Sequence, residues 1–243
     1  MTKIKILDVK KFVTPLKSLS LSVNSIVLTK KGDTLAVNAK SEDASQVANI
    51  LYTSKIVEYA EGGDTEKMGI YNLGEFISVL QLFSDVNALE LVIEGNTCTI
   101  QFNDKSKIDY ILSDLSLITE GPEKLKSEIP WFATIEVDSS FIKKVKSISS
   151  SIDVNILKLK SAKGKLSYNI SSKQSQSHNY SEVIADCDKD FDVSVSIKDD
   201  KRDNFGYLYD GVKYKISIHT KVIQLEAVGT EYGMLRYYIA PLV

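Results

Sequence analysis

Two stretches of the chain carry the same pattern of hydrophobic and polar positions. The segment that begins at Phe12 reads FVTPLKSLSLSV, and the segment that begins at Phe141 reads FIKKVKSISSSI. Matched residues lie 129 positions apart in these segments. Each segment is followed by alternating residues around a glycine, Gly32 or Gly164, which predicts a hairpin. Because one unit recurs within the chain, the pattern predicts two similar domains in tandem.

Apolar residues recur at helical spacing in three segments, and each segment follows a residue that caps helices well. The capping residues are Asp8, Asn72 and Asp138. Pro15 interrupts the first pattern. Because proline lacks a backbone N–H and crowds the preceding turn, we expect that helix to kink or to begin only at the residue before the proline. A fourth, poorly patterned helix is predicted over residues 198–209.

Alternation of apolar and polar residues predicts strands in both halves of the chain. Turn residues separate the strands, including Glu61–Asp64 and the pair Gly95 and Asn96. The predicted strands are residues 3–7, 25–30, 34–39, 48–52, 55–59, 88–94, 97–102 and 108–112 in the first half, and residues 132–137, 155–160, 165–170, 178–185, 191–197, 213–219, 222–227 and 235–240 in the second.

The segment over residues 113–130 has irregular polarity and carries two of the four prolines, which is typical of an interdomain connector. We therefore predict an N-terminal domain over residues 1–114, a connector over residues 115–130 and a C-terminal domain over residues 131–243. The chain has 243 residues, of which 43% are hydrophobic, and this is enough for one core in each domain. The predicted fold class is α+β, with one domain present twice.

The charge balance limits how the protein could bind nucleic acid. The chain carries 30 basic and 32 acidic residues, which excludes a protein that binds nucleic acid through overall positive charge. No apolar run approaches the roughly 20 residues that span a bilayer, so no membrane partner is expected. The first residues, MTKIKILDVKK, lack the apolar core of a secretory signal, and we expect an intracellular location.

The residues that most often carry catalysis or bind metal are few and scattered. Cys98 and Cys187 have no second cysteine at metal-ligand spacing, and His178 and His219 are isolated in the sequence. No motif of a hydrolase nucleophile, a phosphate-binding loop, a metalloprotease or a dinucleotide site occurs. We expect a protein that is not an enzyme and that uses no metal and no cofactor.

Three segments resemble one protein family and occur in the order that the family has. The closing segment LRYYIAPL, Leu235–Leu242, is similar to the last strand of proliferating cell nuclear antigen. The segment GIYNLGEFISVLQLFSDVNALELVIEG from Gly69 and the segment EIPWFATIEV, Glu128–Val137, are similar to T-even phage clamps. Together with the internal repeat, they make the chain resemble the DNA sliding clamp family. The resemblance implies two duplicated clamp domains, each with antiparallel sheets outside and short helices lining the inner face.

The resemblance also implies a function. Sliding clamps close head to tail into a ring around duplex DNA and tether the replicative polymerase, and so act as processivity factors in DNA replication. Two domains per chain imply a homotrimer, since three chains then supply six similar units. The implied partners are double-stranded DNA bound without sequence preference, a DNA polymerase and a clamp loader bound through short peptides, and other copies of the chain. The phage-like segments imply a viral protein that acts in the host cytoplasm or, in a eukaryotic host, in the nucleus or at a viral replication site.

Basic residues on the helices of the implied ring are candidates for facing DNA. Dispersed cations in the bore attract phosphates without reading bases, so the ring can stay mobile. Lys17 and Lys146 occupy matched positions in the two repeats. The full candidate set is Lys10, Lys11, Lys17, Lys143, Lys144, Lys146, Lys198, Lys201 and Arg202.

The resemblance implies a second site, a partner-peptide pocket between the connector and the closing strand. Short peptides dock by inserting apolar anchors into pockets of this kind. The candidate residues are Ile118, Leu125, Tyr238, Ile239 and Pro241.

Two other functions stay open on the sequence alone. One is a two-domain, strand-rich structural protein of a virion or scaffold, without DNA-encircling activity. The other is a single-strand binder, which would expose aromatic side chains along a basic groove. The twelve tyrosines are scattered and mostly alternate along predicted strands, which disfavours the single-strand binder. The sequence therefore favours the clamp and keeps the structural protein as the alternative.

Overall fold

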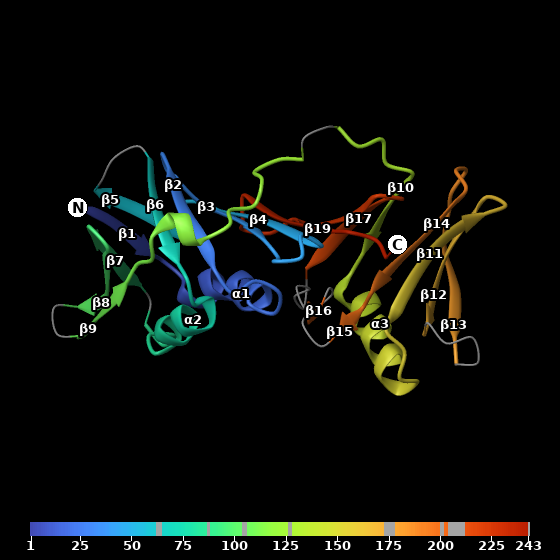
Figure 1. Ribbon diagram of the computed structural model, residues 1–243, viewed down its shortest axis with the longest axis horizontal. Coiled ribbons are helices and arrows are strands. Elements are labelled where there is room, and N and C mark those ends of the chain that lie inside the picture. Colours follow the sequence, from blue (N-terminus) through green and yellow to red (C-terminus); the bar gives the residue numbers. More distant parts are fainter. Residues whose placement is uncertain are drawn as a thin grey trace. The chain divides into compact units, whose positions relative to one another are not determined.

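The computed structural model describes residues 1–61, 65–86, 88–103, 106–125, 128–172, 178–199, 202–203 and 212–242 (Figure 1). The chain forms two compact units. The first comprises Met1–Lys124 with Thr230–Leu235, and the second comprises Leu125–Gly229 with Arg236–Val243. The boundary between them along the chain falls inside the predicted connector.

Antiparallel strands and two α-helices build the first unit. The helices are α1 (Val9–Leu19) and α2 (Leu73–Gln81), and a short 3₁₀ helix η1 (Leu115–Leu117) follows the last strand. The strands are β1 (Thr2–Ile6), β2 (Ile26–Lys31), β3 (Thr34–Lys40), β4 (Gln46–Tyr52), β5 (Val57–Glu61), β6 (Thr65–Ile70), β7 (Leu89–Glu94), β8 (Thr97–Asn103) and β9 (Ser106–Ile111).

The core of the first unit lies between its strands and its two helices. One sheet has the strand order β5-β1-β7-β8-β9, and β4, β3, β2 and β6 lie side by side in another. Helices α1 and α2 pack against each other (Figure 1). Their apolar residues Phe12, Leu16, Phe76 and Leu80 are fully buried, and each such side chain contributes roughly 1.5–3 kcal/mol to stability.

The second unit contains one α-helix among its described residues, α3 (Ser139–Ser151). Strands β13, β12, β11 and β14 form one sheet in that order, and β10, β17, β18 and β19 lie side by side in another. The strands are β10 (Ala133–Val137), β11 (Ile156–Ala162), β12 (Lys165–Ser171), β13 (Tyr180–Asp186), β14 (Phe191–Ser196), β15 (Lys198–Asp199), β16 (Arg202–Asp203), β17 (Lys213–His219), β18 (Val222–Val228) and β19 (Met234–Ile239).

The repeat in the sequence corresponds to a repeat in structure. Helices α1 and α3 each follow one strand and begin after an aspartate, and the side chains of Asp8 and Asp138 accept backbone N–H bonds from the first turn. Each helix is followed by a hairpin whose glycine has positive φ, 53° at Gly32 and 76° at Gly164. Because only glycine adopts that backbone conformation without a steric cost, both turns need it. The two units are thus variants of one α+β domain.

The structure differs from the sequence prediction in three elements. Helix α1 begins at Val9 and runs through Pro15, so it does not start beside the proline. Strand β6, which the sequence analysis did not predict, pairs with β2 along its whole length. The predicted fourth helix is wrong in its described part, because β15 and β16 form a two-stranded hairpin there. Residues 198–203 read KDDKRD and are all charged, so they offer no apolar helical face, which explains the failure of a helix. Of the predicted turn at Glu61–Asp64, only the first residue is described.

Candidate nucleic-acid and partner interfaces

Helix α1 presents two exposed lysines on one side. Its apolar stripe faces the core, whereas Lys10 and Lys17 are exposed and lie two helical turns apart. Both line a hollow of about 350 Å³ together with Gln81 and Ser84 at the end of α2. Helix α2 has no basic residue, so the lysines of this helix pair come from α1 alone. The arrangement offers two exposed cations to a polyanion.

The third lysine of α1 is engaged by a distant segment. The ammonium of Lys11 lies 2.6 Å from a carboxylate oxygen of Glu231 and 3.4 Å from one of Asp8. The hydrogen bond with Glu231 is the main cause that raises the pKa of Lys11. Lys11 is exposed and forms an ion pair with Glu231. Its predicted contact with DNA stays a prediction.

Helix α3 carries three of the predicted lysines, and one of them is tied to the neighbouring sheet. The ammonium of Lys144 lies 2.5 Å from Oε2 of Glu182 on β13. The same oxygen accepts hydrogen bonds from the hydroxyls of Tyr168 at 2.6 Å and Tyr180 at 2.9 Å. These donors, Lys144 first, lower the pKa of Glu182 to about 2. Lys144 therefore helps to fix β13 against α3.

The remaining predicted lysines differ in exposure. Lys143 is exposed and Lys146, the counterpart of Lys17 in the repeat, is half-buried. Lys198 and Arg202 lie in β15 and β16, and their side chains are not among those that the structure describes. Lys201 lies outside the described residues.

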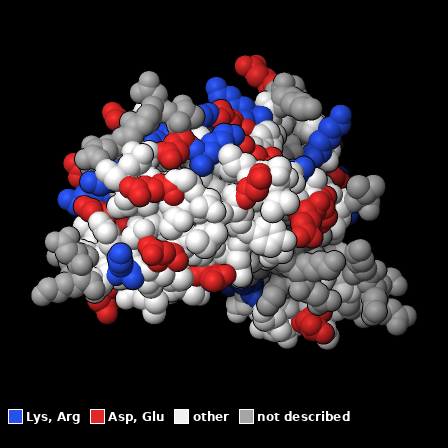
Figure 2. Space-filling view, turned by 60° about the vertical axis from the view of Figure 1, so that its left-hand side comes forward, with Lys and Arg blue, Asp and Glu red and all other residues white. Residues whose placement is uncertain are grey.

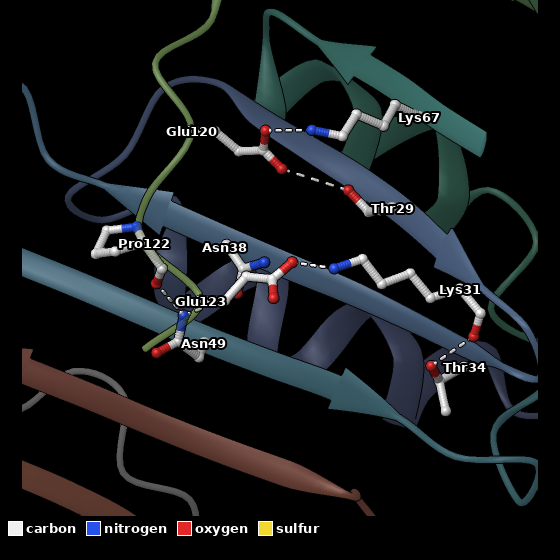
Figure 3. A network of polar contacts seen from close by, with 9 residues as sticks. All are labelled: Thr29, Lys31, Thr34, Asn38, Asn49, Lys67, Glu120, Pro122 and Glu123. Atoms are coloured by element: carbon white, nitrogen blue, oxygen red, sulfur yellow. Dashed lines mark hydrogen bonds and ion pairs between the residues drawn. The ribbon is translucent and has the colours of Figure 1, made fainter. Parts of the chain in front are cut away.

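The first half of the connector is fastened to the outer face of the β2-β3-β4 strands (Figure 3). Glu120 accepts a hydrogen bond from Lys67 at 2.6 Å and a longer one from Thr29 at 3.4 Å. Glu123 forms an ion pair with Lys31, which lowers the pKa of the Glu123 carboxyl. These pairs lie on the surface, so each contributes little to stability, roughly 0–1 kcal/mol. Their effect is to hold the connector in one path.

Neutral contacts reinforce that path. Asn49, which is fully buried, donates from its side-chain amide to the carbonyl of Pro122 at 2.9 Å. The N–H of Gly121 donates to the Asn38 carbonyl at 2.8 Å. A Cβ on Gly121 would come within 2.5 Å of the Ala39 carbonyl oxygen, so only glycine permits this close approach. These contacts hold residues 118–123 in one path along the strands.

Beside this fastened segment lies a hollow of about 600 Å³ that the sequence analysis did not predict. Residues 23–25, 40–42 and 71–72 line it together with the connector residues Leu117 and Thr119. Leu117 is 66% exposed and Tyr71, which also lines the hollow, is 60% exposed, and these are high values for large apolar side chains. The hollow therefore combines an apolar rim with polar walls. The apolar residues Leu115, Leu117 and Ile118 near the start of the connector were the available sequence signal for it.

The residues predicted for the partner pocket fall into two groups. Ile118, Tyr238 and Ile239 are buried within the chain itself. Leu125 and Pro241 are half-buried and keep part of their surface open to solvent. None of the five lines the hollow beside Leu117.

In each unit, an edge strand of one sheet carries an exposed apolar residue. Strand β9 is the last strand of its sheet, and Ile111 at its end is 64% exposed. Strand β13 is likewise the last strand of its sheet, and Val183 in its middle is 60% exposed. An edge strand with an exposed apolar side chain is a ready partner for another strand.

The face in Figure 2 mixes charges of both signs among uncharged residues, so its coloured residues form no broad basic patch. Within the described residues, no group of three or more His, Cys, Asp and Glu side chains is placed to hold a metal ion. No helix in that part of the chain is long and apolar enough to span a bilayer.

Comparison with solved structures reveals the fold. No family model and no curated relative matches the sequence. The structure superimposes on proliferating cell nuclear antigen (PCNA) of A. fulgidus with a TM-score of 0.80, at 17% identity, over 100% of this chain and 99% of that chain. PCNA of Thermococcus kodakaraensis also gives 0.80, at 14% identity and complete coverage of both chains. PCNA of Entamoeba histolytica gives 0.76, at 16% identity, over 100% and 99%. The resemblance seen in the sequence is confirmed, and the chain has the fold of the DNA sliding clamps.

Proposed function

We propose that the protein is a DNA sliding clamp, a processivity factor that encircles duplex DNA as a ring and tethers a replicative polymerase. The observation that carries the proposal is the clamp fold over the whole chain, together with exposed lysines on the helices of both units. Such a protein is a scaffold and not an enzyme. The alternative of a purely structural protein has no observation in its favour.

The lysines supply the proposed DNA contact. Lys10, Lys17 and Lys143 are exposed residues, and Lys11 and Lys144, which are also exposed, form ion pairs with carboxylates. Few, dispersed and sequence-independent contacts attract the duplex without fixing the ring at one place. A chain with a net charge of −2 can therefore slide on a polyanion, because the attraction comes from position and not from total charge.

The two exposed strand edges support self-assembly. If β9 of one copy pairs with β13 of the next, each contact joins two different surfaces, and such a head-to-tail contact closes only when the rotation per copy fits a ring. Three copies, with six similar units, are the proposed closed assembly. A further similar structure is a complex of PCNA2 and PCNA3 from Sulfolobus tokodaii, with a TM-score of 0.76 and 16% identity over 98% of both chains.

The connector and its hollow are the proposed docking place for partner peptides, of a polymerase or a clamp loader. The A. fulgidus structure named above holds the C-terminal region of FEN-1. In this chain, a bulky apolar anchor would seat between Leu117 and Tyr71 in the 600 Å³ hollow. The sequence-predicted residues Leu125 and Pro241 stay candidates for further peptide contacts. We place the protein inside the host cell, as a viral replication factor.

Replacing Leu117 by aspartate is expected to weaken this docking. A carboxylate on the apolar rim would have to be desolvated by an incoming apolar anchor, so the affinity should fall at least about tenfold. Calorimetric titration with terminal peptides of the cognate polymerase measures it. Val228→Asp is the matched control, since Val228 is also an exposed apolar residue but lies outside the hollow. If both variants bind the peptide with equal affinity, the hollow is not part of the peptide site.

The function itself is tested by solution mass and by retention on DNA. A closed trimer of 27.0 kDa chains has a mass of about 81 kDa by light scattering. After loading with its clamp loader, the protein should stay on circular duplex DNA and slip off when the circle is cut. A monomer at all concentrations that ignores the topology of the DNA would overturn the proposal.

A further inference from the structure

Pro15 leaves one carbonyl of α1 without its usual donor. In an α-helix the N–H of each residue bonds to the carbonyl four positions earlier, and proline has no N–H. The carbonyl that loses its partner is that of Lys11. Helix α1 nevertheless continues through Pro15, from Val9 to Leu19. The Lys11 carbonyl must therefore accept a hydrogen bond from another group of the chain or from water.

The hydroxyl of Tyr232 supplies the missing bond. It donates to the Lys11 carbonyl at 2.7 Å, although the two residues lie 221 positions apart in the chain. The ring of Tyr232 packs edge to face on that of Tyr52 with centroids 6.1 Å apart. Tyr52 in turn donates its hydroxyl to the next carbonyl, that of Phe12, at 2.8 Å. Two tyrosines therefore contact consecutive carbonyls at the site of the proline.

The segment that carries Tyr232 is itself anchored in the first unit. The Thr53 hydroxyl donates to the carbonyl of Glu231 at 2.9 Å, and the N–H of Gly233 donates to the Leu51 carbonyl at 2.9 Å. The Glu231 carboxylate holds the ammonium of Lys11 at 2.6 Å. Backbone and side chain of Lys11 are thus both bound by residues 231–232.

We infer that Glu231 and Tyr232 form a brace that positions α1, by replacing the N–H that Pro15 lacks and by withdrawing Lys11 from the DNA-facing set. The inference rests on the proposed function in one respect, namely that α1 faces DNA. The brace fixes the turn between Lys10 and Lys17, the two lysines that line the hollow beside α2. Tyr232 is a positioning residue, because it acts on DNA only through α1.

A double-mutant cycle tests the brace without DNA. In Tyr232→Phe the Lys11 carbonyl loses its donor, and the melting temperature should fall by about 2–4 °C, as expected for one net hydrogen bond in a chain of this size. In Pro15→Ala the helix regains an N–H at position 15. Adding Tyr232→Phe to this variant should then lower the melting temperature by less than half as much as it does in the wild-type protein. Equal shifts in both backgrounds would overturn the inference.

Tyr52→Phe is the matched control. It removes a hydroxyl from the same aromatic pair, but the Phe12 carbonyl keeps its helical donor at Leu16, so Pro15→Ala should not change its effect. If the effect of Tyr52→Phe depended on Pro15→Ala as strongly as the effect of Tyr232→Phe does, that result would also count against the brace.

A DNA measurement separates positioning from mere stability. Well below the melting temperature, Tyr232→Phe should weaken binding to a labelled linear duplex at low salt by about threefold, and Pro15→Ala should restore it. Unchanged binding by Tyr232→Phe would reduce the brace to a structural role and overturn the positioning claim. If the wild-type protein neither binds linear duplex nor stays on circular duplex after loading, while the cycle shows coupling, the brace stands and the proposed clamp function fails.

Discussion

Reversing the charge of Lys10 and Lys17 together, in a Lys10→Glu, Lys17→Glu variant, is expected to reduce binding to duplex DNA at low salt by at least about tenfold. Each lysine that neutralises a phosphate releases a counterion, so losing two contacts should lower the slope of log affinity against log salt by about 2 for each subunit on the DNA. Both side chains are exposed on α1, so the fold should be unaffected. Fluorescence anisotropy with labelled duplex over a salt series measures both quantities.

The control for this variant makes the same change of charge elsewhere in the chain. Lys55 and Lys221 are exposed in turns outside the helices, and Lys55→Glu with Lys221→Glu shifts the net charge equally. If net charge alone governed binding, both double variants would lose affinity alike, and α1 would not be the DNA face. A normal salt slope in the α1 variant would contradict the assignment even if its affinity fell.

Local sequence signals predicted the helices of the repeat well. The aspartates at positions 8 and 138 cap helices in the structure as their type and place suggest, and Asn72 does the same for α2. A helix cap depends on residues within one turn, so a few neighbouring residues in the sequence are enough to predict it. Of the two outcomes expected at Pro15, a kink or a late start, the late start is wrong, since α1 begins at Val9. The Lys11 carbonyl, which lacks the N–H of Pro15, accepts a hydrogen bond from Tyr232, far away in sequence.

Elements and contacts that depend on distant residues were less predictable. Strand β6 reads TEKMGI and shows little alternation, yet it pairs with β2, and the Ser113 carbonyl approaches its Gly69 so closely that a Cβ would not fit. The same limit applies to the candidate DNA-facing lysines. Helical spacing put Lys11 on the outer face of its helix and Lys144 at the flank of the apolar stripe, and both residues are exposed. Only the three-dimensional structure shows their carboxylate partners Glu231 and Glu182.

Placing a carboxylate on either sheet edge is expected to convert the proposed trimer into monomers. In Ile111→Asp, a charged group replaces a side chain that is 64% exposed in the isolated chain but would be covered in a β9 to β13 contact. Burying it without a partner costs several kcal/mol, enough to dissociate a ring at micromolar concentration. Light scattering should then give 27.0 kDa. Val228→Asp, exposed but outside both edges, should leave the trimer intact.

Mixing two such monomers decides between head-to-tail and symmetric assembly. Ile111→Asp keeps an intact β13, and Val183→Asp keeps an intact β9, so together they can make one good β9 to β13 contact and no second one. The mixture should therefore stop at a dimer of about 54 kDa, although each variant alone stays monomeric. In a symmetric contact of two like edges, one variant would dimerise by itself and mixing would add nothing. A dimer that appears only on mixing is the result that a ring-forming, heterologous interface requires.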